Sequence, residues 1–410
     1  MPRASLVLLT FLLTAQASPH EAGQTLDGQS LLQQGRYLAA RDASARAAFD
    51  PAGRVRDGDA YQNWRQYAPM VTNELPLDGL RRGSDVAMPD RQAAVLVRGA
   101  DARDALTEIV ARARHTRVVI VNEAHYSPRD RVFALQVARA LRPLGYSYLA
   151  VETISNNPPG APRAEAQLLR DGFVRRNTGT YTQDPVFAAY LREAVCLGYR
   201  PIAYEITPAQ REKGADAATR EEAQASNLMA AVFDRDPTAK VLIHVGHGHV
   251  VETPLPRPDG TMARMAARLK AKTGIDPLTI DQTGLTDLAP TMRLAYPIAA
   301  AKVGPADGIL FRHGAPLVLG PFAGGVDVQV LHPARAYRDG RPVWLRALGG
   351  QPVAIPTALL PARGERLVQA FAADAPADAV PLDRVLVTAG RPAPKLLLPP
   401  GVRVRYAVQP

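Results

Sequence analysis

Residues 117–125 read R-V-V-I-V-N-E-A-H, a short apolar run that ends in polar side chains. Four consecutive β-branched residues are typical of a strand covered on both faces of a parallel sheet. Helical spacing precedes the run over residues 102–114 and follows it over residues 128–144, where Gly145 ends the pattern. A helix, strand and helix in this order predict a βαβ arrangement.

The same alternation continues outward along the chain. Strands are predicted at residues 146–151, 200–204, 240–245 and 277–281, with helices at 184–197, 220–233 and 261–273 between them. This pattern predicts an α/β fold with a mostly parallel sheet and helices on both faces. From residue 293 onward, short apolar runs recur between Gly and Pro, which predicts a smaller C-terminal β-rich domain over 293–410.

The first residues have the features of a secretory signal peptide. Arg3 precedes the apolar run of residues 6–13, and T-A-Q-A follows at residues 14–17. We therefore expect residues 1–17 to be a cleaved signal peptide, and the protein to be periplasmic or secreted. The run is too short to span a membrane, no second such run follows, and no cysteine follows the cleavage site for lipid attachment. Residues 18–95 are predicted to form an N-terminal extension packed on an α/β core at residues 96–292.

Charge and cysteine content narrow the function classes. The 410-residue chain has a formal net charge of +10, but its basic residues are scattered and form no cluster interleaved with aromatics. We therefore expect no nucleic-acid partner, and a small-molecule or peptide substrate instead; the sequence leaves the oligomeric state open. The single cysteine, Cys196, has no partner for an internal disulfide and lies in an apolar pattern that predicts burial.

Ionisable residues follow four of the predicted strands. They are Glu123 with His125, then Glu152, then Glu205, and finally His247 with His249 in G-H-G-H. Open α/β sheets bind ligands beyond the carboxyl ends of their strands, so parallel strands would bring these side chains together. His244, two residues before Gly246, lies within a strand and is expected to be a packed core histidine. Carboxylates with imidazoles suit a divalent metal or shared acid–base catalysis, although strand-end glutamates also cap helices.

N-E-A-H after a strand, V-E after the next unit and G-H-G-H further on resemble a known superfamily. It joins Tiki-type metalloproteases, ChaN-like haem-uptake proteins and erythromycin-esterase-like hydrolases. The resemblance covers residues 97–285, and the helix before Gly274 also looks like the family's. Asn122 stands where the family's first motif has glycine, which puts the local backbone geometry in question.

The resemblance implies a parallel α/β core with metal ligands or acid–base residues at Glu123, His125 and His249. We expect a metal-dependent hydrolase of peptide or ester bonds, with zinc, manganese or iron held by His125, His249 and Glu152. Glu123 would then be the base. Glu205, His247 and Tyr126 are supporting candidates, and residues 155–182 would form a wall or lid of the pocket.

Two alternatives remain open at this stage. One is a haem- or ligand-binding uptake protein without catalysis, in which Tyr126, Tyr204 or His249 would meet the iron. The other is an interaction module in which the strand-end acids only cap helices.

Overall fold

The computed structural model describes residues 27–75, 90–157, 160–212, 214–257, 260–289 and 292–410. The predicted signal peptide lies outside these ranges. The main sheet has the order β1-β9-β11-β8-β2-β5-β3-β4, and β10 pairs with β9. Its strands are β1 (Asp101–Asp104), β2 (Val118–Glu123), β3 (Tyr148–Val151), β4 (Arg200–Ala203), β5 (Val241–Gly246), β8 (Leu278–Asp281), β9 (Gly308–Arg312), β10 (Ala315–Pro316) and β11 (Val328–Leu331).

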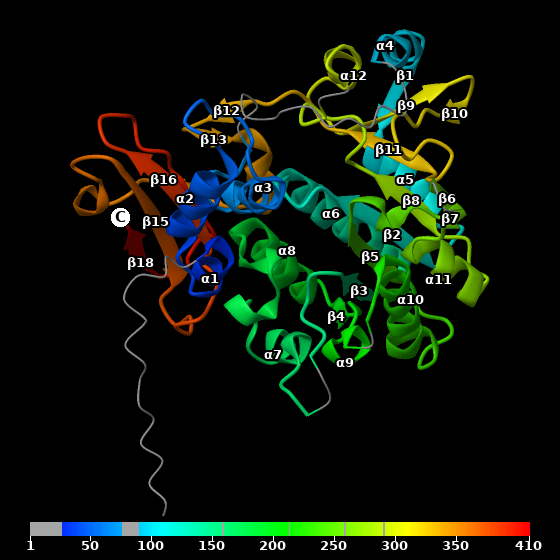
Figure 1. Cartoon of the computed structure of the whole chain (residues 1–410), viewed down its shortest axis with the longest axis horizontal. Helices are drawn as coiled ribbons and strands as arrows, with labels where there is room; N and C mark the ends of the chain where they lie inside the picture. The colour runs from blue at the N-terminus through cyan, green and yellow to red at the C-terminus, as the bar shows by residue number, and fades with distance from the viewer. Residues whose placement is uncertain (1–26, 76–89, 158–159, 213, 258–259, 290–291) are drawn as a thin grey trace, which may run out of the picture.

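The sheet is parallel from β11 to β4 and antiparallel around β9. Helices cover both of its faces (Figure 1). One face packs on α5 (Ala105–Ala113), α6 (Pro128–Leu141), α7 (Ala164–Asp171) and α8 (Pro185–Cys196), and the other on α10 (Ala217–Leu228) and α11 (Met265–Thr273). The predicted fold class is confirmed.

Strand β2 shows why this architecture forms. All six of its residues are buried, with Val119 and Val121 in the core under α6, and Val118 and Ile120 in the core under α10. Alternating side chains of a strand point to opposite faces, so a continuous apolar run requires cover on both sides. The α6 helix begins with Pro128, whose missing N–H is harmless at that position.

The boundary predicted at residue 293 is too early. Helix α12 (Ala295–Val303) and strands β9 and β11 belong to the α/β part, and α12 packs against α4 (Asp90–Arg98). The antiparallel sheets of the C-terminal part begin only afterwards. They comprise β12 (Tyr337–Arg338) with β13 (Arg341–Pro342), β14 (Gln351–Val353) with β17 (Leu396–Leu398), and β15 (Glu365–Ala372) between β16 (Asp383–Thr388) and β18 (Val404–Gln409).

The N-terminal helices lie beside the C-terminal sheets (Figure 1). Helices α1 (Gly28–Gln33), α2 (Tyr37–Ala48) and α3 (Gly58–Thr72) share a core with Leu367 of β15. The end of α3 also meets the α/β part, where Ala68 packs with Leu75 and Leu288. The extension thus packs on both parts, whereas the sequence predicted only the α/β core as its partner. Cys196 is exposed, so its predicted burial is wrong: it is the last residue of α8.

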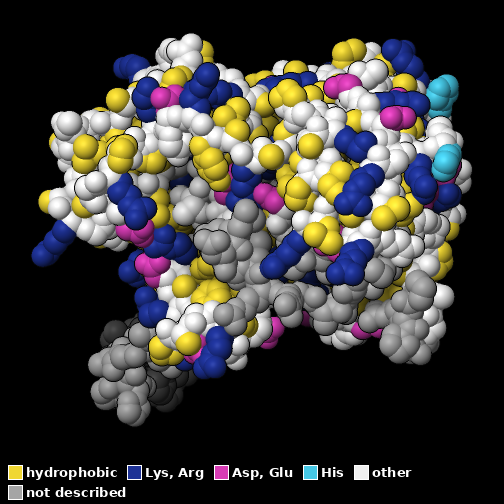
Figure 2. Space-filling model, turned by 90° about the horizontal axis from the view of Figure 1, so that it is seen from above, with side chains coloured by type: hydrophobic (Ala, Val, Ile, Leu, Met, Phe, Trp, Pro, Cys, Tyr) yellow, Lys and Arg dark blue, Asp and Glu magenta, His cyan; other side chains and the backbone are white. Residues whose placement is uncertain are grey.

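The remaining elements are short. A hairpin of β6 (Leu255–Arg257) and β7 (Gly260–Met262) precedes α11, and α9 (Pro208–Arg211) follows β4. Within the described ranges, every helix is too short or too polar to cross a membrane. Figure 2 shows Lys and Arg side chains spread over one face among acidic and apolar ones, without a single basic patch.

Candidate active site

The four predicted strand ends meet at one edge of the sheet. Strands β2, β5, β3 and β4 are consecutive neighbours and all parallel, so their carboxyl ends point the same way. Glu152 accepts a hydrogen bond from the Gly246 N–H, and His249 Nε2 lies 3.4 Å from Glu152 Oε1. The convergence predicted from the sequence is confirmed.

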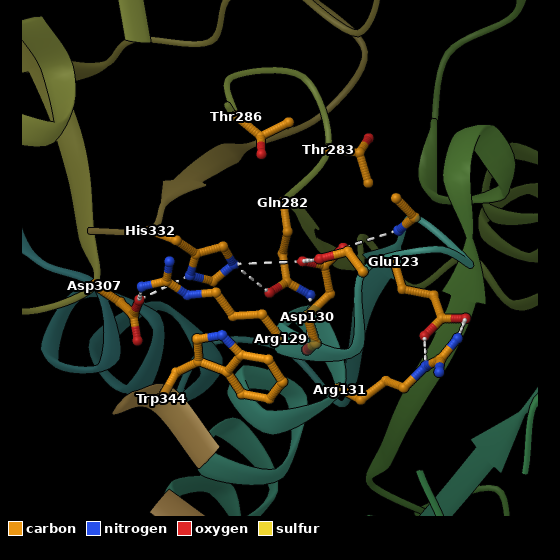
Figure 3. Close-up of polar contacts among 12 residues, drawn as sticks. Glu123, Arg129, Asp130, Arg131, Gln282, Thr283, Thr286, Asp307, His332 and Trp344 are labelled. Atoms are coloured by element: carbon orange, nitrogen blue, oxygen red, sulfur yellow. Dashed lines mark hydrogen bonds and ion pairs between the residues drawn. The ribbon is translucent and has the colours of Figure 1, made fainter. Parts of the chain in front are cut away.

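Glu123 and His125 form a hydrogen-bonded pair. His125 Nδ1 lies 2.9 Å from Glu123 Oε1, and only 1% of the Glu123 surface is exposed. Arg131 Nε donates to Glu123 Oε2 at 2.6 Å, an ion pair visible in Figure 3, and Arg131 also donates to the His125 carbonyl at 2.8 Å. Burial alone would raise the pKa of Glu123, but Arg131 and His125 outweigh it and hold that pKa well below its usual range.

This pairing sets the tautomer of His125. An ionised carboxylate only accepts hydrogen bonds, so Glu123 receives the Nδ1–H of the neutral ring. The lone pair of the ring therefore resides on Nε2. His125 lines a cavity of about 560 Å³, which gives this nitrogen access to a bound molecule.

Gly246 supplies the space for this ring. A Cβ built on Gly246 would collide with Cε1 and Nε2 of His125 and would lie 3.1 Å from Glu152 Oε2. The φ angle of Gly246 is −85°, which any residue can adopt, so the requirement is for room and not for backbone freedom. By contrast, a Cβ on Gly248 would have its nearest neighbour, Phe322 Cε1, at 3.5 Å.

His249 belongs to a second Glu–His pair. Its Nδ1 lies 2.8 Å from Glu221 Oε2, and Glu221 also accepts from Arg264. Burial lowers the pKa of His249, but Glu152 and Glu221 outweigh burial and raise it. Burial likewise opposes ionisation of Glu152, whereas His249, His125 and Arg220 lower its pKa to about 2.

Arg220 of α10 joins the expected carboxylates. Its guanidinium donates to Glu152 at 2.5 Å and to both oxygens of Glu205, and its NH1 lies 3.0 Å from His249 Nε2. Glu205, which also lines the cavity, is therefore linked to Glu152 through this arginine. The wall opposite includes residues 155–157 and 180–181, so the insertion predicted to line the pocket does so.

Tyr181 covers the imidazole of His125. The two rings stack with centroids 4.1 Å apart and an interplanar angle of 19°. The hydroxyl of Tyr181 donates to Gln66 at 3.2 Å, which brings helix α3 of the N-terminal extension to the rim of the cavity. The ring of His125 is thus fixed by Glu123 at one edge and by Tyr181 over one face.

The other histidines and Tyr126 occupy different positions. His244 is 2% exposed and packs against Phe187 and Tyr190, which confirms its prediction as a core residue. His247 has a φ of 38°, and its ring lies 5.1 Å from that of His125. Burial lowers the pKa of His247 to about 4. Tyr126 packs against His247 with its ring under the Arg65 guanidinium.

Asn122 stands where the resembling family has glycine, and its side chain makes hydrogen bonds that hold neighbouring segments of the backbone. Its fully buried amide donates to the His247 carbonyl at 3.0 Å and to Asp281 at 2.7 Å, and its oxygen accepts from the Gln282 N–H. It thereby ties the ends of β2, β5 and β8 together. The backbone of His247 is held in its left-handed conformation by this bond.

A polar cluster around Asp130 and His332 supports the turn that carries His125 (Figure 3). Asp130 accepts from the Ala124 N–H at 2.9 Å and from the Ser127 hydroxyl at 2.7 Å. Its neighbour His332 contacts Gln282 and Asp307. Burial raises the pKa of Asp130 to about 6. Asp130 and Arg131, consecutive in the first turn of α6, thus hold the Glu123–His125 part of the N-E-A-H segment.

The residues expected to hold a divalent ion do not fit one in this arrangement. Arg220 donates to Glu152 and Glu205 and contacts His249 Nε2, so a cation already lies among these donors. Within the part of the chain that the structure describes, no group of three or more His, Cys, Asp or Glu side chains is arranged to hold a metal. The predicted metal site remains a prediction without support from the donor geometry.

The tyrosines considered for haem do not line the cavity. Tyr126 lies under Arg65, with the guanidinium carbon 3.9 Å from the ring centre. Tyr204 is fully buried and donates its hydroxyl to the His244 carbonyl. The aromatic side chain that faces the cavity is Tyr181.

Comparisons with known proteins are sparse. No family model and no curated protein matches this chain. Solved structures with a similar arrangement include RRSP, a MARTX toxin effector domain from Vibrio vulnificus CMCP6, at 14% identity and a TM-score of 0.33 over 60% of this chain and 54% of that one. Two others, described as bacterial protein toxins, match at 14% and 13% identity with TM-scores of 0.36 and 0.34, over 63% of this chain and 57% of theirs. This chain thus spans little more than half the length of those structures.

Proposed function

We propose that this protein is a hydrolase of peptide or ester bonds in which the Glu123–His125 pair is the general base. The observation that carries the proposal is the geometry of His125. Its Nδ1 is bound to an ionised, buried glutamate, and its ring lines a cavity of about 560 Å³. This combination of a backed imidazole and an open pocket is what proton abstraction from water requires.

In the proposed reaction, Nε2 of His125 removes a proton from water as the water oxygen attacks the substrate carbonyl carbon. The carbonyl π electrons move to oxygen, and the Arg220 guanidinium, which lines the same cavity, stabilises the resulting oxyanion. When the tetrahedral intermediate collapses, the imidazolium of His125 gives the proton to the leaving amine or alkoxide. Glu123 stabilises that imidazolium and keeps the ring oriented, in the role that a carboxylate has in a catalytic triad.

Glu152 and Glu205 hold Arg220 in place. Burial lowers the pKa of Arg220, but Glu205 and Glu152 outweigh burial and raise that pKa above the usual value of arginine. The charge of Arg220 is therefore permanent. Glu152 also binds the Gly246 N–H next to His125 and so links the two halves of the site. The sequence-based proposal of the Tiki, ChaN and erythromycin-esterase-like superfamily is compatible with a hydrolase of this kind. The reaction proposed here uses His125, Glu123 and Arg220 and has no step at a metal.

The test uses p-nitrophenyl acetate and a casein labelled with a quenched fluorophore. His125→Ala should lower kcat/KM by about 10²- to 10⁴-fold for the substrate that is cleaved. His115→Ala is the matched control, because His115 is exposed and lines a different pocket. Equal activity of the His125→Ala variant and wild type would refute the proposal. Loss of wild-type activity in EDTA, with recovery on adding zinc, would instead support the metal-dependent mechanism.

A further inference from the structure

Arg384 of β16 is a buried arginine with an unusual set of partners. It is 0% exposed, and it donates to the backbone carbonyls of Met70 at 3.2 Å and Gln183 at 3.0 Å. Its guanidinium carbon lies 3.6 Å from the centre of the Tyr37 ring, and its Nε has no hydrogen-bond partner. The adjacent Asp383 binds Arg341. Among the described residues, no carboxylate forms an ion pair with Arg384.

A buried cation without a carboxylate in contact is costly, because its solvation is lost without an equal return. Hydrogen bonds to two carbonyls could be made by a neutral donor, so they do not explain the charge. The nearest acid along the chain from the Gln183 carbonyl is Asp184, which is also 0% exposed. Through the Gln183 carbonyl, Arg384 holds the backbone immediately before Asp184, and its charge opposes the rise in the pKa of Asp184 that burial causes.

Asp184 lies behind the proposed general base. Its Oδ2 accepts from Arg131 NH1 at 2.7 Å, and its Oδ1 caps helix α8 by accepting from the Val186 N–H. Arg131 in turn donates to Glu123. Burial raises the pKa of Asp184, and the two cations that oppose this are Arg131 from α6 and Arg384 from β16.

We propose that Arg384 is a positioning residue for the reaction, whose buried charge keeps Asp184 in the ionised form that holds Arg131 against Glu123. This rests on the proposed function, since the chain of contacts ends at His125. It gives the C-terminal sheet a part in the active site, although β16 contributes no side chain to the cavity. The link runs from Arg384 through Asp184, Arg131 and Glu123 to the His125 ring.

The test follows the His125 Nδ1–H signal by NMR as the pH is lowered, and assigns it with His125→Ala. In wild type, this proton is held by Glu123 and should persist to low pH. In Arg384→Met, protonation of Asp184 should release Arg131 and remove the signal at a pH about one unit higher. Arg384→Lys keeps the charge and should retain the wild-type behaviour.

Further variants separate charge from packing. Arg366→Met is the matched control, because Arg366 lies on the neighbouring β15 and also donates to two carbonyls. If Arg384→Met does not fold, Arg384→Gln replaces it as a neutral variant that still carries an N–H donor. An unchanged signal in all Arg384 variants would overturn the proposal. An equal change in Arg384→Lys and Arg384→Met would overturn it too, because packing would then be the cause.

The same variants are assayed for hydrolysis. The acid limb of kcat/KM should move to higher pH in Arg384→Met and not in Arg384→Lys. Because the NMR signal does not require turnover, the positioning role and the proposed hydrolase activity can fail separately. Full activity of His125→Ala would refute the role of His125 as the general base, while the NMR signal would still decide the link to Arg384.

Discussion

Replacing Gly246 with alanine should disable the site by displacing His125. The added Cβ would collide with Cε1 and Nε2 of the imidazole, the part of the ring that faces the cavity. The ring cannot move away from this Cβ without breaking one of its contacts. Tyr181 stacks on it at 4.1 Å, and Nδ1 is bound to Glu123, which is itself held by Arg131.

The expected effect is larger on catalysis than on stability. Overpacking of a tightly packed site costs about 1–3 kcal/mol, so the free energy of unfolding should fall by that amount. A displacement of the base by about 1 Å is expected to lower kcat by about 10²-fold, because the attack geometry is lost. Substrate affinity should change little, since the cavity walls at residues 155–157 lie on another segment.

Gly248→Ala is the matched control from the same G-H-G-H segment. Its Cβ would meet Phe322 Cε1 at 3.5 Å, an ordinary van der Waals distance. Steady-state hydrolysis and urea unfolding of both variants measure the difference. Wild-type kcat in Gly246→Ala, or an equal loss in Gly248→Ala, would refute the reasoning that Gly246 is there to make room for His125.

Three further results are expected. Glu123→Gln should destabilise the fold by about 3–5 kcal/mol in urea unfolding, because it leaves the charge of Arg131 partly unpaired, and should remove activity; a stable, active variant would contradict this. Glu152 has its pKa lowered from 4.5 to about 2, so it stabilises the fold above about pH 4.5 and loses this contribution as the pH falls towards 2; Glu152→Gln should lack that component, about 3 kcal/mol, in unfolding measured across this range. Tyr181→Phe should keep the stack on His125 and nearly all activity, whereas Tyr181→Ala should lower kcat; equal rates in the two would show that stacking is unimportant.

The convergence of the site was predictable because it follows from strand direction. Glu123, Glu152 and Glu205 each come at the end of an apolar run, and a parallel sheet brings such ends to one edge. The sequence also predicted different roles for His244, in the core, and His249, in the site. His244, inside a buried strand, packs in the core, while His249, beyond the glycine, contacts the polar residues at the strand ends.

The arginines were not predictable in the same way. Arg220 and Glu221 lie in a charged helix, where a polar face ordinarily faces solvent, and nothing in the spacing shows that α10 aims them at the strand ends. Arg131 is one of two arginines in the P-R-D-R turn. The feature of the sequence that could have indicated Arg131 is its position next to Asp130 in the first turn of a helix that follows the N-E-A-H segment.

The misplaced boundary at residue 293 has a physical cause as well. Strands β9 and β11 are short and meet in an antiparallel pair, so locally they resemble the β-rich sheets that follow. Their membership of the main sheet depends on the parallel pairing of β11 with β8, a contact between residues 328–329 and 280–281. Pairings of that kind depend on tertiary packing, which local periodicity does not encode.

The two Glu–His pairs are alike in geometry, yet their surroundings give them different roles. The carboxylate of Glu123 is shared between His125 and Arg131, so a permanent cation already satisfies much of its charge. His249 lies between Glu221 and Glu152, which favour its protonated form, and it is not among the residues that line the cavity. A base must reach the substrate, and of the two rings it is His125, stacked on Tyr181, that lines the cavity. The same pair of residue types therefore yields one histidine that faces the cavity as the base and one that pairs with Glu221 and Glu152, because their surroundings differ.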